Sequence, residues 1–580
     1  MEEKQITLQI DRHYITVPEG STILEAARKI GIDIPTLCHI DLKGTCVKNN
    51  PASCRICVVE VEGRRNLAPA CATRCTEGMV VRTSTLRVMN ARKVVAELIL
   101  SDHPNDCLTC PKCGNCELQT LALRFNIRRM PYNGGELSPR KREVTSSIVR
   151  NMDKCIFCRR CESVCNEVQT VGALGAIRRG FNTTIAPAFD KMMSDSECTY
   201  CGQCVAVCPV GALTERDHTN RLLLDLENPD KVVIVQTAPA VRAALGEEFG
   251  LPAGTLVTGK MVYALRELGF DYVFDTDFAA DLTIMEEGAE ILNRLTRYMN
   301  GDKSVRLPIL TSCCPAWVKY CENKYPEFVP NLSTCRSPQQ MFGAVVREYY
   351  KDPEKNEGKK IVSVSIMPCT AKKEEILRPE SYTNGKQDVD YVLTTTEIVR
   401  MIRKSGIVFD KVEIEAADVP FGIGSGSGVI FGVTGGVTEA VLRRLQQGHN
   451  RVDMESIKKS GVRGDDGIKV LTYNYNGREI KAAVVNGLAN ADKVLQQIKN
   501  HEAEYDFVEV MACRRGCIMG GGQPVNAGPR TRKARMKGLY DTDVNTQIKK
   551  SNENPMILSL YDTLLKGKEH ELLHRNFSGK

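Results

Sequence analysis

Three short segments in the C-terminal half of the chain carry cysteines suited to metal chemistry. They are Thr311–Trp317 (TSCCPAW), Met367–Lys373 (MPCTAKK) and Met511–Pro524 (MACRRGCIMGGGQP). The thiolates on offer are Cys313, Cys314, Cys369, Cys513 and Cys517. Four of them can bind one iron-sulfur cluster. Adjacent cysteines do not readily bind one cluster equivalently, so the pattern predicts one spare, titratable thiol with an ordinary pKa of about 8.5.

Two matched cysteine runs precede these segments, each spaced C-x2-C-x2-C-x3-C. They are Cys155, Cys158, Cys161 and Cys165, then Cys198, Cys201, Cys204 and Cys208. In two-cluster ferredoxins the fourth cysteine of each run ligates the other cluster. We therefore expect two [4Fe-4S] clusters, with Cys208 completing the first set and Cys165 the second. Zinc is a poor rival for so regular a repeat, although Asn166 replaces the usual proline.

The N-terminal region offers a further set of four cysteines. Strands at 5–10 and 13–17 and a helix from Thr22, with the capping-box residue Glu25, are expected to precede it. The set is Cys38, Cys54, Cys57 and Cys71, and it suits a [2Fe-2S] cluster, with zinc as the alternative. Cys46 and Cys75 are read as spare thiols that could compete for a ligand role.

A histidine begins the next metal-binding pattern. It comprises His103, Cys107, Cys110 and Cys116, which suit a His/Cys3 [4Fe-4S] cluster. Zinc would accept the same ligands. The stretch resembles a motif of hydrogenases and NADH dehydrogenase subunits, and this resemblance implies the cluster and fits Cys113 less well. Imidazole in place of one thiolate would change the charge, and hence the potential, of such a cluster.

The composition excludes several classes of protein. The chain has 580 residues, 25 cysteines and a net charge of +7. Its N-terminus lacks a signal-peptide pattern, and the C-x-x-C runs favour metal over disulfides. No apolar run reaches about 18 residues, so no membrane span is expected. The modest charge does not suggest nucleic acid but is compatible with an acidic electron carrier. We expect a cytoplasmic protein that avoids oxygen.

The metal ligands need several domains to position them. We expect a [2Fe-2S] β-grasp domain at 1–82, a His/Cys3 domain at 83–125, a two-[4Fe-4S] ferredoxin-like domain at 126–225 and an α/β domain at 226–580. Resemblance to a known enzyme family implies that the last is two-lobed and catalytic. In the last, apolar strands at 232–237 and 361–366 alternate with helices at 260–268 and 438–445, which predicts α/β structure around a covered, parallel sheet. The whole is multidomain, α/β and α+β.

The three C-terminal cysteine segments, in this order, resemble the active-site signatures of the [FeFe] hydrogenases. The likeness covers nearly the whole chain, and the N-terminal modules are similar to the large iron-sulfur subunit of NADH dehydrogenases. It implies that Cys314, Cys369, Cys513 and Cys517 hold the [4Fe-4S] part of an H-cluster. Cys517 would also bridge to a diiron centre with carbonyl, cyanide and azadithiolate ligands. The other domains would add three [4Fe-4S] clusters and one [2Fe-2S] cluster.

The resemblance also implies a proton relay. It would run through Cys313, Glu287, Ser333, Glu290 and Arg294. Glu287, Glu290 and Arg294 share one face of an expected helix, which without the family context would be read as a solvated charged face.

Residues around the diiron centre follow from the same resemblance. Lys372 and Gln339 match contacts to the diiron ligands, and Met367 and Met511 match pocket-lining thioethers. The segment containing Ala238 and Pro239 matches the pocket wall; Ala240 stands where better-known monomeric enzymes have serine. Cys321 and Cys335 are read as buried, small hydrophobic residues.

Glycine-rich stretches at 421–428 and 432–436 look like nucleotide loops. Neither fits a phosphate-binding motif, so we expect these glycines to let the backbone pass close to the cluster. We expect no flavin or NAD site on this chain.

The favoured hypothesis is the catalytic subunit of a soluble complex. Its partners would be a flavin- and NAD(P)-binding subunit, a small [2Fe-2S] subunit and ferredoxin, with electron bifurcation and dedicated maturation proteins. One alternative is a self-contained ferredoxin hydrogenase. The other is a non-catalytic iron-sulfur assembly protein, which should lack the Cys313–Cys314 pair or the glutamates of the relay.

Overall fold

The computed structural model describes residues 4–40, 52–132, 141–445, 457–464, 466–475, 478–524 and 529–575. Cys46 lies outside them. The chain forms two compact units: one holds 1–168, 172–196 and 207–214, and the other holds 169–171, 197–206 and 215–580. Among the described residues, none of the helices combines the length and the apolar character of a membrane span.

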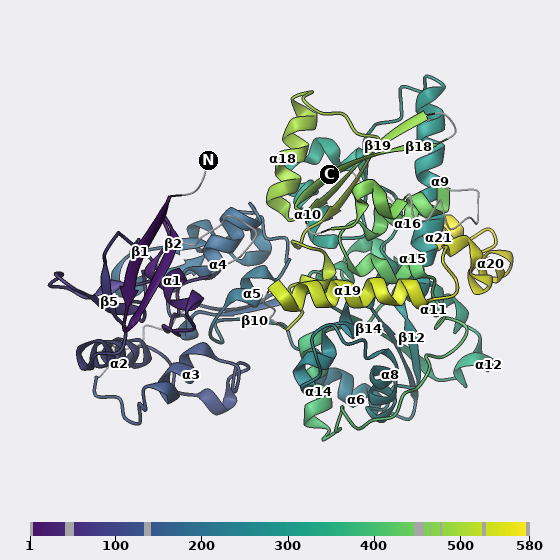
Figure 1. Cartoon of the computed structure of the whole chain (residues 1–580). Helices are drawn as coiled ribbons and strands as arrows, with labels where there is room; N and C mark the ends of the chain where they lie inside the picture. Colours follow the sequence, from purple (N-terminus) through teal and green to yellow (C-terminus); the bar gives the residue numbers. More distant parts are fainter. Residues whose placement is uncertain are drawn as a thin grey trace. The chain divides into compact units, whose positions relative to one another are not determined.

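The N-terminal unit begins with a five-stranded sheet in the order β2-β1-β5-β3-β4. Its strands are β1 (Gln5–Ile10), β2 (His13–Pro18), β3 (Val58–Val61), β4 (Ala68–Pro69) and β5 (Val80–Arg82). The expected first two strands are confirmed as an antiparallel pair (Figure 1). Helix α1 (Ile23–Lys29) starts at the predicted capping box, in which Thr22 and Glu25 exchange hydrogen bonds.

The rest of this unit consists of short elements between the cysteine runs. They include α2 (Leu86–Ser101), α3 (Glu117–Arg124), β6 (Arg142–Val144), β7 (Ile148–Asn151), α4 (Arg160–Ser163), β8 (Gly175–Ile177) and β9 (Thr184–Ala186). A buried ion pair between Arg150 and Glu143, at 3.0 Å, ties β7 to β6.

The second unit is built on two four-stranded sheets. The first, in the order β12-β11-β14-β17, contains β11 (Lys231–Thr237), β12 (Tyr272–Asp275), β14 (Lys360–Met367) and β17 (Tyr391–Thr394). All its pairs are parallel, and β11 and β14 are buried along most of their length, as their apolar sequences predict. The second, in the order β13-β20-β19-β18, contains β13 (Ile309–Leu310), β18 (Ile468–Tyr475), β19 (Arg478–Asn486) and β20 (Phe507–Met511).

Helices pack around the two sheets. They include α6 (Thr219–Leu226), α8 (Thr258–Glu267), α10 (Pro315–Lys324), α11 (Pro338–Tyr349), α13 (Lys372–Glu375), α14 (Thr395–Lys404), α16 (Gly436–Leu445), α18 (Leu488–Lys499), α19 (Pro529–Asn545), α20 (Pro555–Asp562) and α21 (Glu569–Leu573). The predicted helices at 260–268 and 438–445 correspond to α8 and α16.

One long helix, α9 (Thr276–Met299), joins the two halves of this unit. Phe278 and Leu282, in its first half, pack in a core with Ile234 of the first sheet. Ile291 and Leu295 pack in another core with residues of the second sheet. The helix therefore belongs to both lobes.

A buried carboxylate anchors α9. Asp281 accepts hydrogen bonds from the Ser425 hydroxyl at 2.5 Å, the Ser551 hydroxyl at 2.8 Å and the Asn554 amide at 3.1 Å. Ser425 lies far in the sequence from Ser551 and Asn554, so this side chain joins α9 to two other segments.

We expect Asp281→Ala to lower the free energy of unfolding by about 3 kcal/mol or more, because it leaves several buried donors unsatisfied. Thermal unfolding of the cofactor-free protein would measure this. Asp541→Ala is the matched control, because Asp541 is half-exposed and its ion pair with Lys537, at 3.6 Å, lies at the surface. This substitution should change the free energy of unfolding by at most about 0.5 kcal/mol. Equal unfolding temperatures for the two variants would contradict the anchoring role.

Candidate active site

A small cavity of about 90 Å³ lies at the carboxyl ends of strands from both sheets. Loops that follow β11 and β14 form one wall, and loops that follow β13 and β20 form another. The lining includes Ala238, Pro239, Ala240, Cys313, Cys314, Gln339, Met367, Cys369, Lys372, Met511 and Cys517. The structure thus brings all three cysteine segments to one cavity.

The four expected cluster ligands converge here. Cys314, Cys369 and Cys517 line the cavity, and Cys513 is buried close to them. Burial raises the pKa of each thiol above its ordinary value, to about 12 for Cys517. A thiolate in such a pocket needs a positive partner. Four converging, buried sulfurs therefore fit an iron-sulfur cluster, whose iron would add positive charge to that of Lys372, which lines the same cavity.

Cys313 occupies a different position from its neighbour. It lines the cavity, and burial followed by the nearby Glu287 carboxylate raises the pKa of its thiol well above the ordinary range. Lys372 acts in the opposite direction. Cys313 therefore lies between the cavity and the first predicted relay carboxyl.

The other predicted relay residues form a connected chain. The Ser333 hydroxyl is in hydrogen-bonding contact with the Glu287 carboxyl and donates to Glu290 Oε2 at 2.6 Å. Glu290 in turn pairs with Arg294 at 2.6 Å. The expected helical face is confirmed, since both glutamates and the arginine lie on α9. The side chain of Arg294 is 16 % exposed, which places it near the surface.

Burial also sets the protonation of Glu287. Desolvation, with the charges of Glu290 and Glu509, raises the pKa of its carboxyl to about 8. Its Oε2 atom is buried and has no hydrogen-bond partner among the described residues. A carboxyl that titrates near neutral pH can both accept and release a proton.

The catalytic unit matches a known family of metalloenzymes. Residues 231–521 match the family model "Iron only hydrogenase large subunit, C-terminal domain". The chain is 52% identical over 577 residues to the NADP-reducing hydrogenase subunit HndD of Solidesulfovibrio fructosivorans, covering 99% of this chain and 98% of the relative.

This chain belongs to the [FeFe] hydrogenase family.

Two further relatives of this hydrogenase extend the comparison. Iron hydrogenase 1 of Clostridium pasteurianum is 38% identical, over 98% of this chain and 99% of the relative. A solved structure of a variant of [FeFe]-hydrogenase HydA1 from Chlamydomonas reinhardtii is 37% identical with a TM-score of 0.53, covering 63% of this chain and 100% of that one.

Other family models match the remaining parts of the hydrogenase. Residues 3–85 match a 2Fe-2S iron-sulfur cluster binding domain, and 92–131 match the NADH-ubiquinone oxidoreductase-G iron-sulfur binding region. Residues 145–214 match the ferredoxin-like domain of NADH-quinone oxidoreductase subunit 3, and 529–580 match the iron hydrogenase small subunit. The predicted multidomain fold class is confirmed.

Lys372 is held by a partner that sequence reasoning missed. Its ammonium group lies 2.8 Å from both the Glu375 carboxylate and the Ser337 hydroxyl, and 3.2 Å from the Cys313 carbonyl oxygen. The Gln339 amide donates to the same carboxylate at 2.9 Å. Glu375 is fully buried, so this ion pair fixes both predicted contact residues. The i, i+3 spacing of Lys372 and Glu375 in the sequence could have indicated this ion pair.

A second missed residue contacts a cluster ligand. Gln203 donates to the sulfur of Cys513 and to the Met519 carbonyl oxygen, each at 3.3 Å. No sequence signal indicates this, because it depends on a contact across about 310 residues.

The glycine-rich stretches behave only partly as expected. Gly432 lines the cavity, but Gly424 and Gly428 abut the backbone of Asp277 near the start of α9. A Cβ at Gly428 would lie 2.5 Å from the Asp277 carbonyl oxygen. The predicted close approach is confirmed for these three glycines, and of the three only Gly432 lines the cavity that would hold the cluster.

Cys321 and Cys335 are both buried, as expected. Cys335 also has a polar contact, since its sulfur lies 3.6 Å from Glu290 Oε2. Its description as a simple hydrophobic residue is therefore incomplete.

The N-terminal unit gathers two predicted ligand sets. Cys155, Cys158, Cys161 and Cys208 line one small cavity. Cys38 contacts the sulfurs of Cys54 and Cys71, and Cys57 lies 3.3 Å from Cys71. In the second ferredoxin set, Cys165 belongs to this unit and Cys198, Cys201 and Cys204 to the other.

His103 has the surroundings of a metal ligand. Its Nδ1 atom bonds to the Pro104 carbonyl oxygen at 2.8 Å, and its buried Nε2 has no hydrogen-bond partner among the described residues. Burial lowers the pKa of the imidazole, which favours the neutral form that binds metals. Cys107, Cys110 and Cys116 lie close enough for their charges to interact. Cys113 is exposed, whereas Cys75 is buried in a hydrophobic core.

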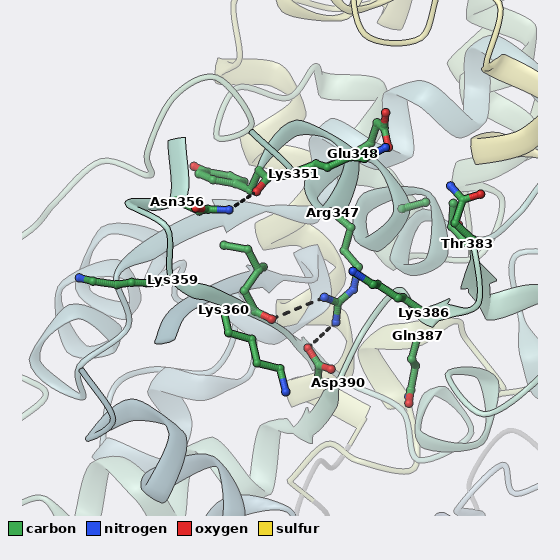
Figure 2. Close-up of a pocket in the computed structure, with 14 residues that line it drawn as sticks. Arg347, Glu348, Lys351, Asn356, Lys359, Lys360, Thr383, Lys386, Gln387 and Asp390 are labelled. Carbon is green, nitrogen blue, oxygen red and sulfur yellow. Dashed lines mark hydrogen bonds and ion pairs between the residues drawn. The ribbon is translucent and has the colours of Figure 1, made fainter. Parts of the chain in front are cut away.

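A larger cavity of about 590 Å³ lies elsewhere in the catalytic unit (Figure 2). Lys351, Lys359, Lys360 and Lys386 border it, and Arg347 pairs with Asp390 at 2.6 Å. No cysteine lines it. It lies at the amino end of β14, opposite the end that carries Met367, so it is separate from the redox site.

The pKa of Glu287 yields a prediction about stability. The carboxyl is protonated in the folded protein up to about pH 8, whereas an unfolded glutamate ionises near pH 4.3. Its contribution is fully present below the unfolded pKa and is lost as pH rises through about 8. Glu287→Gln should therefore raise the unfolding temperature of the cofactor-free protein, relative to wild type, more at about pH 8.5 than at about pH 5.

Glu286→Gln provides the matched control. Burial opposes ionisation of Glu286, but hydrogen bonds from His574 and Tyr561 prevail and lower its pKa. Its contribution is present above the unfolded pKa, so the glutamine variant should lose stability at neutral pH. A Glu287→Gln effect that is independent of pH would contradict the raised pKa.

Proposed function

We propose that this hydrogenase is the catalytic subunit that interconverts protons, electrons and dihydrogen at an H-cluster. The observation that carries the proposal is the convergence of Cys314, Cys369 and Cys517 with Cys313 on one cavity. Cys314, Cys369, Cys513 and Cys517 would hold the [4Fe-4S] part, and Cys517 would also bridge to the diiron centre. When bound, the H-cluster supplies the metal site at which dihydrogen is split or formed.

The protein's own residues orient the cofactor and exclude water. Lys372 and Gln339 face the cavity from the Glu375 network and would contact the diiron ligands. Met367 and Met511 supply uncharged sulfur to the lining. Ala238 and Pro239 close the wall, and Ala240 lacks the hydroxyl that a serine would offer to a cyanide.

Protons would move along the chain described above. Cys313 holds the innermost proton at its sulfur, and Glu287 exchanges it with the Ser333 hydroxyl. Glu290 receives it, and Arg294 stabilises the charge of that carboxylate near the surface. The Ser333–Glu290 distance of 2.6 Å is short enough for direct transfer.

Electrons would travel through the other predicted clusters. These comprise one [2Fe-2S] cluster and three [4Fe-4S] clusters, on the ligand sets named above. The unpartnered Nε2 of His103 and the shared cavity of Cys155, Cys158, Cys161 and Cys208 support two of them. The proposed boundaries, at 82, 125 and 225, would separate the electron-carrying domains from the catalytic domain.

The full-length likeness to an NADP-reducing hydrogenase subunit favours a soluble, cytoplasmic multisubunit complex. A flavin- and NADP-binding partner would then handle the nicotinamide, with a small [2Fe-2S] subunit and ferredoxin as further partners. The likeness to iron hydrogenase 1 supports the second candidate, a self-contained ferredoxin hydrogenase. An assembly protein would not need the Cys313–Glu287 pair, and this chain keeps it.

Cys313→Ala should lower turnover about 100-fold or more while the clusters stay bound, because the relay loses its innermost proton carrier. Dye-coupled hydrogen oxidation and iron content would be measured on the same anaerobic preparation. Cys321→Ala removes a buried thiol outside the cavity and is the control. Wild-type turnover in Cys313→Ala would exclude the relay.

The choice of electron acceptor tests the type of hydrogenase. The isolated chain, loaded with its diiron cofactor, should reduce an artificial dye with hydrogen but reduce ferredoxin or NADP slowly without its partners. Rapid ferredoxin reduction by the chain alone would favour the self-contained enzyme. Inactivity with every acceptor, despite verified loading, would overturn the proposed function.

A further inference from the structure

The C-terminal segment of the described chain lies against the predicted proton relay. This segment is the end of the region that matches the small-subunit family model. After α21, His574 forms an antiparallel bridge with Cys335. The Arg336 amide donates to the Leu573 carbonyl oxygen, and the Arg575 amide to the Thr334 carbonyl oxygen, each at 2.8 Å. Residues 569–575, here named the C-terminal strap, comprise α21 and the two residues after it, and their end pairs with the extended segment 334–336.

The imidazole of His574 connects this strap to α9. Its Nδ1 atom lies 2.9 Å from the Thr334 hydroxyl, and its Nε2 atom lies 2.9 Å from the Glu286 carboxylate. The side chain is mostly buried, with 13 % exposed. Both ring nitrogens therefore have defined partners, and one of these partners adjoins the relay.

Thr334 carries the connection to the relay carboxylate. Its backbone N–H lies 3.1 Å from both carboxyl oxygens of Glu290. The adjacent Ser333 hydroxyl donates to the same carboxylate. A displacement of Thr334 would therefore move the N–H and the hydroxyl that hold Glu290.

The strap also reaches the inner end of the relay. The buried guanidinium of Arg575 donates to the Ser312 carbonyl oxygen at 2.6 Å, one residue before Cys313. Its charge also acts on the nearby Glu287 carboxyl. One short segment thus contacts the backbone beside Cys313, at the inner end of the relay, and beside Ser333, in its middle.

We propose that the C-terminal strap positions the proton relay, and that His574 is the positioning residue that holds Thr334, and through it Glu290, in transfer geometry. The inference rests on the relay in the proposed function. The region that matches the small-subunit family model would then contribute to proton transfer as well as to the fold. Ordinary backbone pairing would keep the strap in place but would not require the imidazole.

Three substitutions separate the two contacts of His574. An asparagine amide can occupy the position of Nδ1 and keep the Thr334 contact, whereas a glutamine amide reaches the position of Nε2 and keeps the Glu286 contact. Alanine removes both. His570→Ala is the matched control, since this exposed ring lies 5.1 Å from that of His574.

In the loaded enzyme, His574→Ala and His574→Gln should lower dye-coupled hydrogen oxidation about tenfold or more, because misplaced relay groups transfer protons slowly. His574→Asn should stay within about twofold of wild type. In protein without the diiron centre, hydrogen exchange at the Thr334 amide should quicken in the alanine and glutamine variants only. Iron content should match that of His570→Ala. The alanine and asparagine variants both lose the Glu286 contact and should show a similar fall in unfolding temperature, although only the alanine variant loses activity.

Equal activity in all three variants would overturn the inference, and so would an asparagine variant as slow as alanine. Activity losses that simply follow a lower unfolding temperature would also overturn it, since they indicate a structural role. Glu290→Ala separates this failure from that of the relay. If Glu290→Ala is inactive while His574→Ala is fully active, only the inference fails. A fully active Glu290→Ala would remove the relay itself.

Discussion

Desolvation of sulfur is the constraint on which the catalytic unit depends. The thiols of Cys314, Cys369, Cys513 and Cys517 are all withdrawn from bulk water, and burial raises the pKa of each. They can bind as thiolates only where metal replaces the lost hydration. Two sheets whose strands end at one place provide this enclosure, and the uncharged lining of methionine, alanine and proline preserves it.

The same low polarity governs the polar groups nearby. A buried ammonium such as that of Lys372 is tolerated because Glu375 lies 2.8 Å away. Among the described residues no cationic side chain lies within hydrogen-bonding distance of Glu287, so its carboxyl keeps its proton to a higher pH. The two groups thus differ in their partners: the Lys372 ammonium lies beside a carboxylate, whereas the Glu287 carboxyl, with a pKa of about 8, is mostly protonated at neutral pH.

Local patterns in the sequence predicted much of this arrangement. The capping box at Thr22, the apolar strands at 232–237 and 361–366, and the helical face of Glu287, Glu290 and Arg294 depend on neighbours within a few residues, so periodicity and spacing reveal them. Convergence of the cysteine segments came from the family resemblance. The contacts of Gln203 with Cys513 and of His574 with Thr334 depend on tertiary packing between distant segments, which one sequence does not encode in any readable pattern.

Helix α9 packs in the cores of both lobes and so couples their positions. At about 1.5 Å per residue its 24 residues span roughly 36 Å, from the core of the first sheet to that of the second. The expected ligands are divided similarly, with Cys369 after the first sheet and Cys314, Cys513 and Cys517 after the second. Helix α9 therefore joins the two lobes, and a cluster on the expected ligands would crosslink the same pair. The free energy of metal binding would then also stabilise the packing of the two lobes against each other. A substitution that weakens this packing, even far from any sulfur, would therefore weaken binding of the metal.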